Sequence, residues 1–120
     1  MSQMFRYVAI GDSTGVGTGA HDGGYVERLF QRLRGVGVHA GLLNLCQNGA
    51  TSQQALLQAD RAASKQPALV TLGVGANDVW RLTPVSAFEA NLRHLGETLE
   101  KSGASVVVCN IADMSLSPIA

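Results

Sequence analysis

The chain has little of several residue types on which whole classes of protein depend. Of its 120 residues, 2 are cysteine, 3 are histidine and 5% are aromatic. A disulfide-stabilised scaffold of this length needs more cysteines, so Cys46 and Cys109 are predicted to be buried, small apolar residues. Since no cluster of metal-ligating residues stands out, we predict neither a metal nor a cofactor.

An excess of charge and a long hydrophobic run are also missing. The 9 Lys and Arg residues balance the 9 Asp and Glu residues, so neither a nucleic acid nor an anionic membrane surface is predicted as a partner. No segment approaches the ~18 consecutive apolar residues of a membrane helix. The first residues lack the charged and then apolar pattern of a signal peptide, so we expect a cytoplasmic location, with a removed leader as the alternative.

The chain does have ample apolar material. The hydrophobic fraction is 46%, which is enough for the core of one compact domain over residues 1–120. Short apolar runs predict strands at residues 7–10, 38–45, 68–72 and 105–109. Amphipathic stretches predict helices from Tyr25 to Gly35, from an N-cap at Ser52 to about Lys65, and from an N-cap at Thr83 to Gly103. In the second helix, the pair Leu56 and Leu57 is expected to face inward.

This alternation predicts the fold class. A β-α-β-α-β-α-β order with continuous apolar strands indicates an α/β protein whose parallel sheet is covered on both faces. Because the crossovers are right-handed, the carboxyl ends of all strands meet at one edge of the sheet. Loops at that edge carry ligand chemistry in open α/β sheets.

Three loops at this edge hold the residues suited to acyl transfer. They span residues 11–15, 47–51 and 73–78, and each follows a predicted strand. Ser13 comes directly after a strand and is the candidate nucleophile. The backbone N–H groups of Ser13 and Gly49 and the side-chain amide of Asn77 are three candidate donors to an oxyanion.

The same residues resemble a known family. Gly11-Asp12-Ser13 resembles the first sequence block of the GDSL/SGNH serine hydrolases, Gly49 the second, and Gly75-Ala76-Asn77-Asp78 the third. The resemblance implies a flavodoxin-like, three-layer α/β/α fold. It also implies that Ser13 is the nucleophile of an esterase or lipase and that Gly49 and Asn77 help to form the oxyanion hole. The substrates that it implies are lipid esters, acetylated sugars, thioesters or small aryl esters.

The family's last block, Asp-x-x-His, is missing from the 120 residues. His39 is predicted at the wrong edge of the sheet and His94 on a solvated helix face, while His21 lacks an orienting acid. We therefore expect a piece of a longer chain, without the last strand and the C-terminal helix, whose His and Asp lie beyond residue 120. The piece alone should be almost inactive. Its open sheet edge is expected to pair with the missing segment or with another copy.

Other interpretations of the same residues remain. Residues 15–20 match the dinucleotide fingerprint Gly-x-Gly-x-x-Ala, although His21 and its neighbours separate that run from the next helix. Residues 11–15 match the Gly-x-Ser-x-Gly elbow of α/β-hydrolases, although only one strand precedes Ser13. A binding module that kept the scaffold without catalysis is the main alternative function. Asp12 is expected to organise its own loop, and Asp78 to cap the turn in which it lies.

Overall fold

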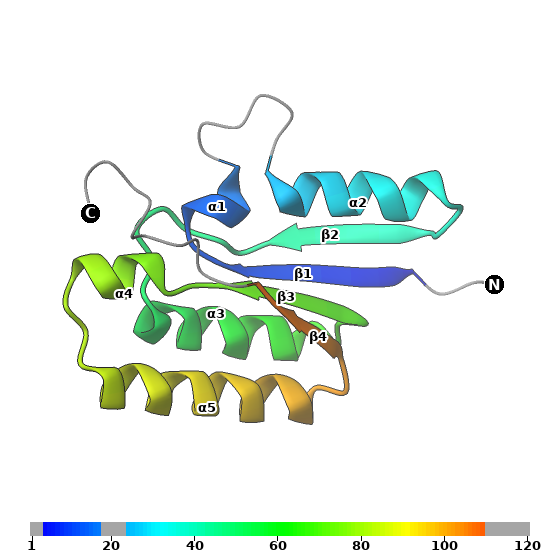
Figure 1. The fold of residues 1–120 in the computed structure, drawn as a ribbon. Helices are drawn as coiled ribbons and strands as arrows, with labels where there is room; N and C mark the ends of the chain where they lie inside the picture. Colours follow the sequence, from blue (N-terminus) through cyan, green and yellow to red (C-terminus); the bar gives the residue numbers. More distant parts are fainter. Residues whose placement is uncertain (1–3, 18–23, 110–120) are drawn as a thin grey trace.

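The computed structural model describes residues 4–17 and 24–109 of the chain, and it has the predicted α/β architecture. Its four strands form one parallel sheet in the order β2-β1-β3-β4 (Figure 1). This order is that of flavodoxin-like sheets. The strands are β1 (Phe5–Gly11), β2 (Ala40–Asn44), β3 (Leu69–Gly73) and β4 (Ser105–Val108).

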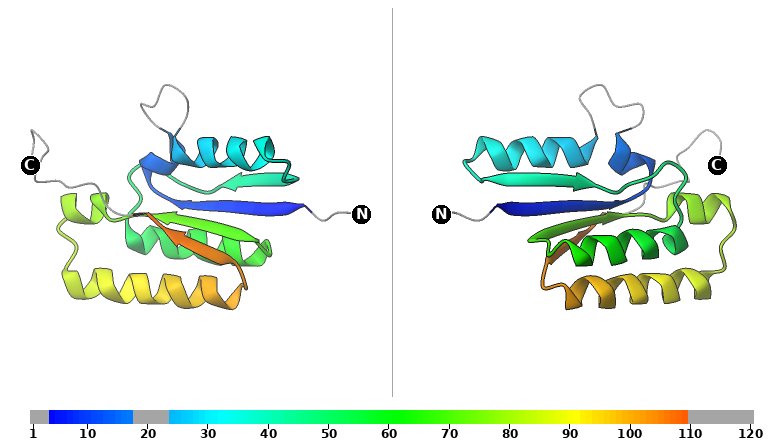
Figure 2. Two further views of the ribbon diagram at one scale, coloured as in Figure 1. Left: turned by 45° about the vertical axis from the view of Figure 1, so that its right-hand side comes forward. Right: turned by 180° about the vertical axis from the view of Figure 1, so that it is seen from behind.

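Helices cover both faces of the sheet. They are α1 (Ser13–Val16), α2 (Tyr25–Gly35), α3 (Ser52–Ser64), α4 (Ala76–Trp80) and α5 (Val85–Lys101). Helix α2 lies along β2 on one face, and α3 and α5 lie side by side on the other, with α3 against β1 (Figure 2). Among the described residues, no helix has both the length and the apolar character needed to cross a membrane.

Two apolar clusters hold the layers together. The larger one lies between the sheet and the α3–α5 pair, where Leu95 and Leu99 of α5 are fully buried. Helix α3 contributes the alanines at 55, 59 and 62 to it, and these small side chains let the helix lie close to β1. The smaller cluster joins Tyr7 and Ala9 of β1 to Val26 of α2. The three helices thus follow the predicted spacing of three and four residues.

Some details differ from the predictions. Leu57 is 71% exposed, whereas Leu56 packs against the core. Consecutive residues point about 100° apart on a helix, so the two could not both face inward. The N-caps are Thr51 and Pro84 rather than Ser52 and Thr83. The N–H of Thr51 donates to Gln54 Oε1 at 2.8 Å, which is half of a capping box.

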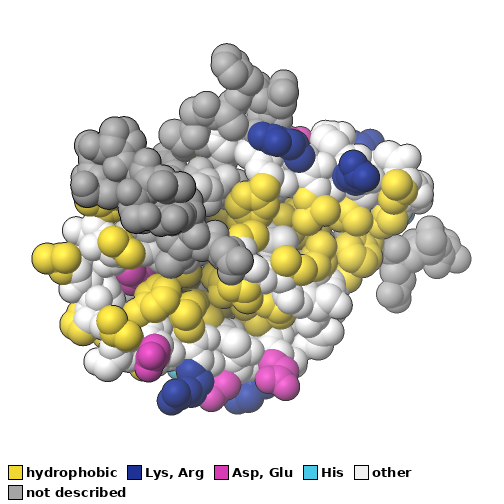
Figure 3. Space-filling view, in the orientation of Figure 1, with side chains coloured by type: hydrophobic (Ala, Val, Ile, Leu, Met, Phe, Trp, Pro, Cys, Tyr) yellow, Lys and Arg dark blue, Asp and Glu magenta, His cyan; other side chains and the backbone are white. Residues whose placement is uncertain are grey.

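The fourth strand is not covered on both faces as predicted. Val106, Val107 and Val108 are all exposed, because β4 lies at the edge of the sheet. On the side that Val107 faces, α2 covers only the opposite end of the sheet. Figure 3 shows the molecule in the orientation of Figure 1. Hydrophobic side chains run across the middle of this view, and charged side chains gather above and below them.

Candidate active site

The first loop at the carboxyl edge begins with a glycine whose backbone conformation other residues rarely adopt, and it continues into a single helical turn. Gly11 closes β1 with φ +143°. Asp12 is the N-cap of α1, and its Oδ1 accepts hydrogen bonds from the N–H of Thr14 at 3.1 Å and from Thr14 Oγ1 at 2.8 Å. Asp12 therefore organises its loop, as predicted. Ser13 is the first residue of α1 and is half-buried.

The second loop follows β2 and leads into α3. Gly49 has φ +79°, a conformation that L side chains rarely adopt. Apart from its chain neighbours, no described residue has a heavy atom within 4 Å of the place where its Cβ would be. The backbone conformation rather than crowding therefore requires glycine at 49. The described part of the chain leaves open space at this position.

The third loop contains a short helix that its sequence did not predict. Asn77 lies in the first turn of α4, and its Nδ2 donates to the carbonyl oxygen of Ala50 at 3.1 Å. This bond joins the third loop to the second and orients the amide. A primary amide has two N–H groups, so one more is available for a substrate oxygen.

Asp78 does not cap its own turn, which corrects the prediction. Its carboxylate reaches the start of α3, where Oδ2 accepts from the N–H of Ser52 at 2.9 Å and Oδ1 from Ser52 Oγ at 2.9 Å. Asn91 of α5 donates to the same Ser52 Oγ at 3.0 Å. Since helix N-termini attract negative charge, this buried acid holds α4 against α3.

Backbone hydrogen bonds tie the three loops together. The N–H of Gln47 donates to the Gly11 carbonyl at 3.0 Å, and the N–H of Asp12 donates to the Gly73 carbonyl at 3.1 Å. Ser13, Gly49 and Asn77 are thus brought to one edge of the sheet, where the topology predicts them. Their roles as nucleophile and oxyanion donors stay predictions.

Two of the three histidines lie away from this edge. His39 is exposed and directly precedes β2, and its carbonyl accepts from the N–H of Phe5, at the start of β1. His94 is exposed on α5. His21 lies outside the described residues, as do residues 18–20 of the fingerprint at residues 15–20. Within that fingerprint, Gly17 ends α1 in a left-handed conformation, and α2 begins only at Tyr25.

Both cysteines are free thiols and are half-buried, rather than fully buried as predicted. Cys46 packs against Gly15 in α1. Burial, with a smaller contribution from the charge of Asp12, raises the pKa of the Cys46 thiol to about 12. At neutral pH this sulfur is therefore a protonated thiol, not a competing nucleophile. Among the described residues, no group of three or more His, Cys, Asp or Glu side chains could hold a metal.

Two polar side chains near Ser13 were missed by sequence reasoning. Asn44, at the end of β2, donates from Nδ2 to the Gly15 carbonyl at 2.8 Å. Gln58, on the inward face of α3, hydrogen-bonds both backbone groups of Gly11. The sequence did contain a signal for Gln58. It lies one helical turn from both Ala55 and Ala62, and it is therefore a polar residue on the alanine-lined face of the helix.

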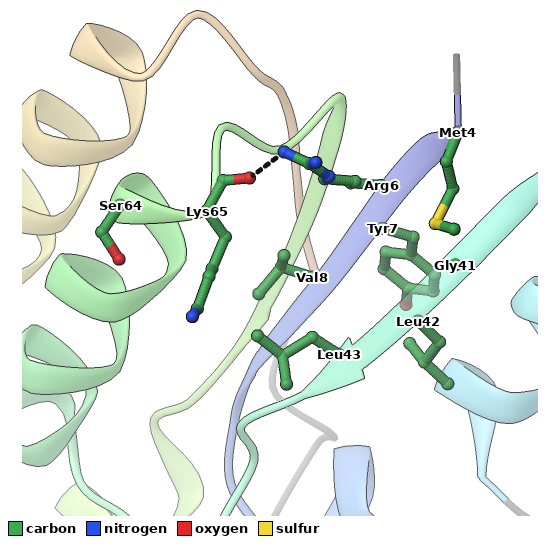
Figure 4. A pocket seen from close by; sticks show the side chains of 9 residues that line it. All are labelled: Met4, Arg6, Tyr7, Val8, Gly41, Leu42, Leu43, Ser64 and Lys65. Atoms are coloured by element: carbon green, nitrogen blue, oxygen red, sulfur yellow. Dashed lines mark hydrogen bonds between the residues drawn. The ribbon is translucent and has the colours of Figure 1, made fainter. Parts of the chain in front are cut away.

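A hollow of about 410 Å³ lies far from this site. It opens beside the amino-terminal ends of β1 and β2, between Met4, Gly41 and the end of α3 at Lys65 (Figure 4). Arg6 crosses it to donate from Nη1 to the Lys65 carbonyl at 3.0 Å. Because the candidate residues are at the carboxyl edge, this hollow is not part of their site.

Comparisons with known proteins identify the family of the chain. The profile of the GDSL-like lipase/acylhydrolase family matches residues 9–119. No curated protein sequence matches the chain. Among solved structures, TesA is 25% identical with a TM-score of 0.80, and the match covers 95% of this chain and 65% of TesA. AlinE4, an SGNH-hydrolase family esterase, is 25% identical with a TM-score of 0.81, over 97% of this chain and 64% of AlinE4.

A third similar structure is also an esterase. The psychrotrophic esterase EstA from Pseudoalteromonas sp. is 26% identical with a TM-score of 0.76, and the match covers 89% of this chain and 60% of EstA. The chain thus spans less than two thirds of the length of each of these three proteins.

Proposed function

Because the chain belongs to the GDSL-like lipase/acylhydrolase family, we propose that it carries the nucleophile and the oxyanion hole of a serine hydrolase that cleaves carboxylic esters. Ser13 Oγ attacks the ester carbonyl to form a tetrahedral intermediate, which expels the alcohol and collapses to an acyl-enzyme on Ser13. The oxyanion accepts hydrogen bonds from the N–H groups of Ser13 and Gly49 and from the Asn77 amide. The substrate is a lipid ester, an acetylated sugar, a thioester or a small aryl ester.

One observation carries this proposal: hydrogen bonds tie together the three loops that hold the three residues. Gln47 and Gly11 join the first two loops, and Asn77 and Ala50 join the last two. An oxyanion hole works because its donors are fixed before charge develops on the substrate. The Asn77–Ala50 bond supplies such fixation for the amide, and the open space at Gly49 leaves room for the substrate oxygen.

The proposal includes a base that the described residues do not supply. His39 and His94 are remote from Ser13. Following the family resemblance, the proposal assigns the proton of Ser13 Oγ to a histidine beyond residue 120 that an aspartate orients. The same histidine returns the proton to the leaving alcohol and then activates water to release the acid. The matches cover 65% of TesA, 64% of AlinE4 and 60% of EstA, so each of these proteins also contains residues outside the matched part.

The test is covalent labelling with a fluorophosphonate probe, read by intact mass and peptide mapping. The full natural protein should gain one adduct at Ser13, and Ser13→Ala should abolish it. Ser86→Ala, which changes an exposed serine on α5, is the matched control and should label normally. The 120-residue chain alone should label on the order of a million-fold more slowly, the cost of losing the histidine in subtilisin.

Two outcomes would contradict the proposal. Absence of an adduct in the full natural protein would favour a binding module on the same scaffold. Rapid labelling of the 120-residue chain by itself would mean that the base lies within it, and His21 would then be the histidine to substitute.

A further inference from the structure

The end of β1 lacks a partner strand on one side, at the place where the Ser13 loop begins. The parallel pairing of β1 with β2 ends at Ala9 and Asn44. Beyond that point, the loop after β2 supplies the N–H of Gln47 to the Gly11 carbonyl. The N–H of Gly11 instead donates to a side chain from α3, namely Gln58 Oε1, at 2.6 Å.

We propose that Gln58 is a positioning residue that fixes the Ser13 loop relative to the Gly49 loop. This inference rests on the proposed function. Gln58 Nε2 donates to the Gly11 carbonyl at 3.1 Å and lies 3.4 Å from Gln47 Oε1. One side chain therefore holds both backbone groups of Gly11 and also reaches the loop of Gly49.

The chemistry of the amide explains why glutamine stands at this position. A primary amide offers one acceptor and an N–H donor, the same pair that a neighbouring strand would offer to Gly11. Gln58 is only 5% exposed, so water does not replace these bonds easily when they are lost. Neither an apolar side chain nor a carboxylate can satisfy both groups.

The position of Gly11 links this contact to the proposed reaction. Gly11 is separated from Ser13 only by Asp12, and Gln47 is separated from Gly49 only by Asn48. A displacement of the nucleophile relative to an oxyanion donor by about 1 Å can slow a reaction by about 100-fold. The hydrogen bonds of Gln58 go to Gly11 and Gln47 rather than to Ser13 or Gly49, so its effect should fall on the rate of acylation and little on substrate affinity.

The decisive variant is Gln58→Met, which keeps the length of the side chain and removes its donor and its acceptor. In the full natural protein we expect labelling of Ser13 to slow by about 10–100-fold, and kcat for an ester to fall by a similar factor while KM changes little. Gln53→Met, on the exposed face of the same helix, is the matched control and should leave both unchanged. A normal labelling rate in folded Gln58→Met would overturn the inference.

A second variant separates positioning from general loss of structure. In Gln58→Glu, the protonated acid can donate to the Gly11 carbonyl and accept from the Gly11 N–H, whereas the carboxylate can only accept. Burial and the facing Gly11 and Gln47 oxygens favour the protonated form and should raise the pKa of that carboxyl. Labelling of this variant should therefore approach the wild-type rate at low pH and fall as pH rises, while circular dichroism stays constant.

A parallel pH dependence of wild type and Gln58→Glu would contradict the inference. A wild-type protein that takes no label at Ser13 would instead defeat the proposed function, and the role of Gln58 is then decided by amide hydrogen exchange. Gln58→Met should accelerate exchange at Gly11 and in both loops, and Gln53→Met should not. Unchanged exchange at Gly11 would overturn the inference in that case.

Discussion

At the scale of single residues, the start of the candidate site depends on a glycine that no other residue can replace. Gly11 has φ +143°, and a Cβ at this position would overlap the carbonyl oxygen of Gly73 in β3. That carbonyl accepts the hydrogen bond of Asp12, so it cannot move without disturbing the Ser13 loop. Both the positive φ of Gly11 and the closeness of the Gly73 carbonyl therefore favour glycine at position 11.

Gly11→Ala should therefore lower the free energy of unfolding by about 2–4 kcal/mol, since strained backbone and overpacking each cost about 1–3 kcal/mol. Urea denaturation followed by far-UV circular dichroism would measure the change. The control is Gly96→Ala in α5, where an added Cβ would meet no other described residue within 4 Å beyond its chain neighbours and the backbone of its own helix. There the same substitution should raise stability by about 0.5–1 kcal/mol. Equal effects of the two substitutions would contradict this account.

At the scale of secondary structure, the long elements could be predicted and the one-turn elements could not. The repeated spacing of apolar residues is enough to predict α2, α3 and α5, and continuous apolar runs predict all four strands. Helices α1 and α4 contain 4 and 5 residues, which is too short for any periodicity. They form because β1 and β3 end beside each other and because the side chains of Asp12 and Asp78 bind nearby donors.

The same limit applies to the candidate site. The positions of Ser13, Gly49 and Asn77 at one edge follow from topology alone, because each comes directly after a parallel strand. The contact of Gln58 with Gly11 joins α3 to β1 and depends on the rotation of a helix. The spacing of Gln58 from Ala55 and Ala62 places it on the inward face, but no local pattern in the sequence identifies Gly11 as its partner. Long-range polar contacts of this kind are visible only once the elements are packed.

Substitution of Asp78 tests how much its hydrogen bonds to Ser52 contribute to holding α4 against α3. In Asp78→Asn, an NH₂ group would replace one of the two oxygens that accept from the N–H and Oγ of Ser52. The loss of one buried hydrogen bond and of a charge at the start of α3 should cost about 1–3 kcal/mol of stability in urea. Asp60→Asn, an exposed change on the same helix, should stay within about 0.5 kcal/mol of the wild type. If Asp78→Asn leaves the free energy of unfolding unchanged, other contacts hold α4 in place.

At the scale of the whole molecule, the helices cover the sheet unevenly. Helix α2 shields β2 and β1, while α3 and α5 pack on the opposite face. On the α2 side, Val107 of β4 pairs with Thr71 of β3 and is 51% exposed. Apart from β3, no described strand pairs with β4. An exposed edge strand with apolar side chains is a template for pairing with another chain.

The 120-residue chain should therefore self-associate through β4, and Val107→Lys should prevent this because a lysine at an edge opposes strand pairing. Sedimentation velocity over a range of concentrations should show a larger average mass for the wild type than for Val107→Lys. Val85→Lys changes a valine that is 73% exposed on α5, away from the sheet edge, and should associate like the wild type. If both lysine variants reduce association equally, general hydrophobicity rather than strand pairing drives it. A wild-type chain that stays monomeric at all concentrations would contradict the prediction outright.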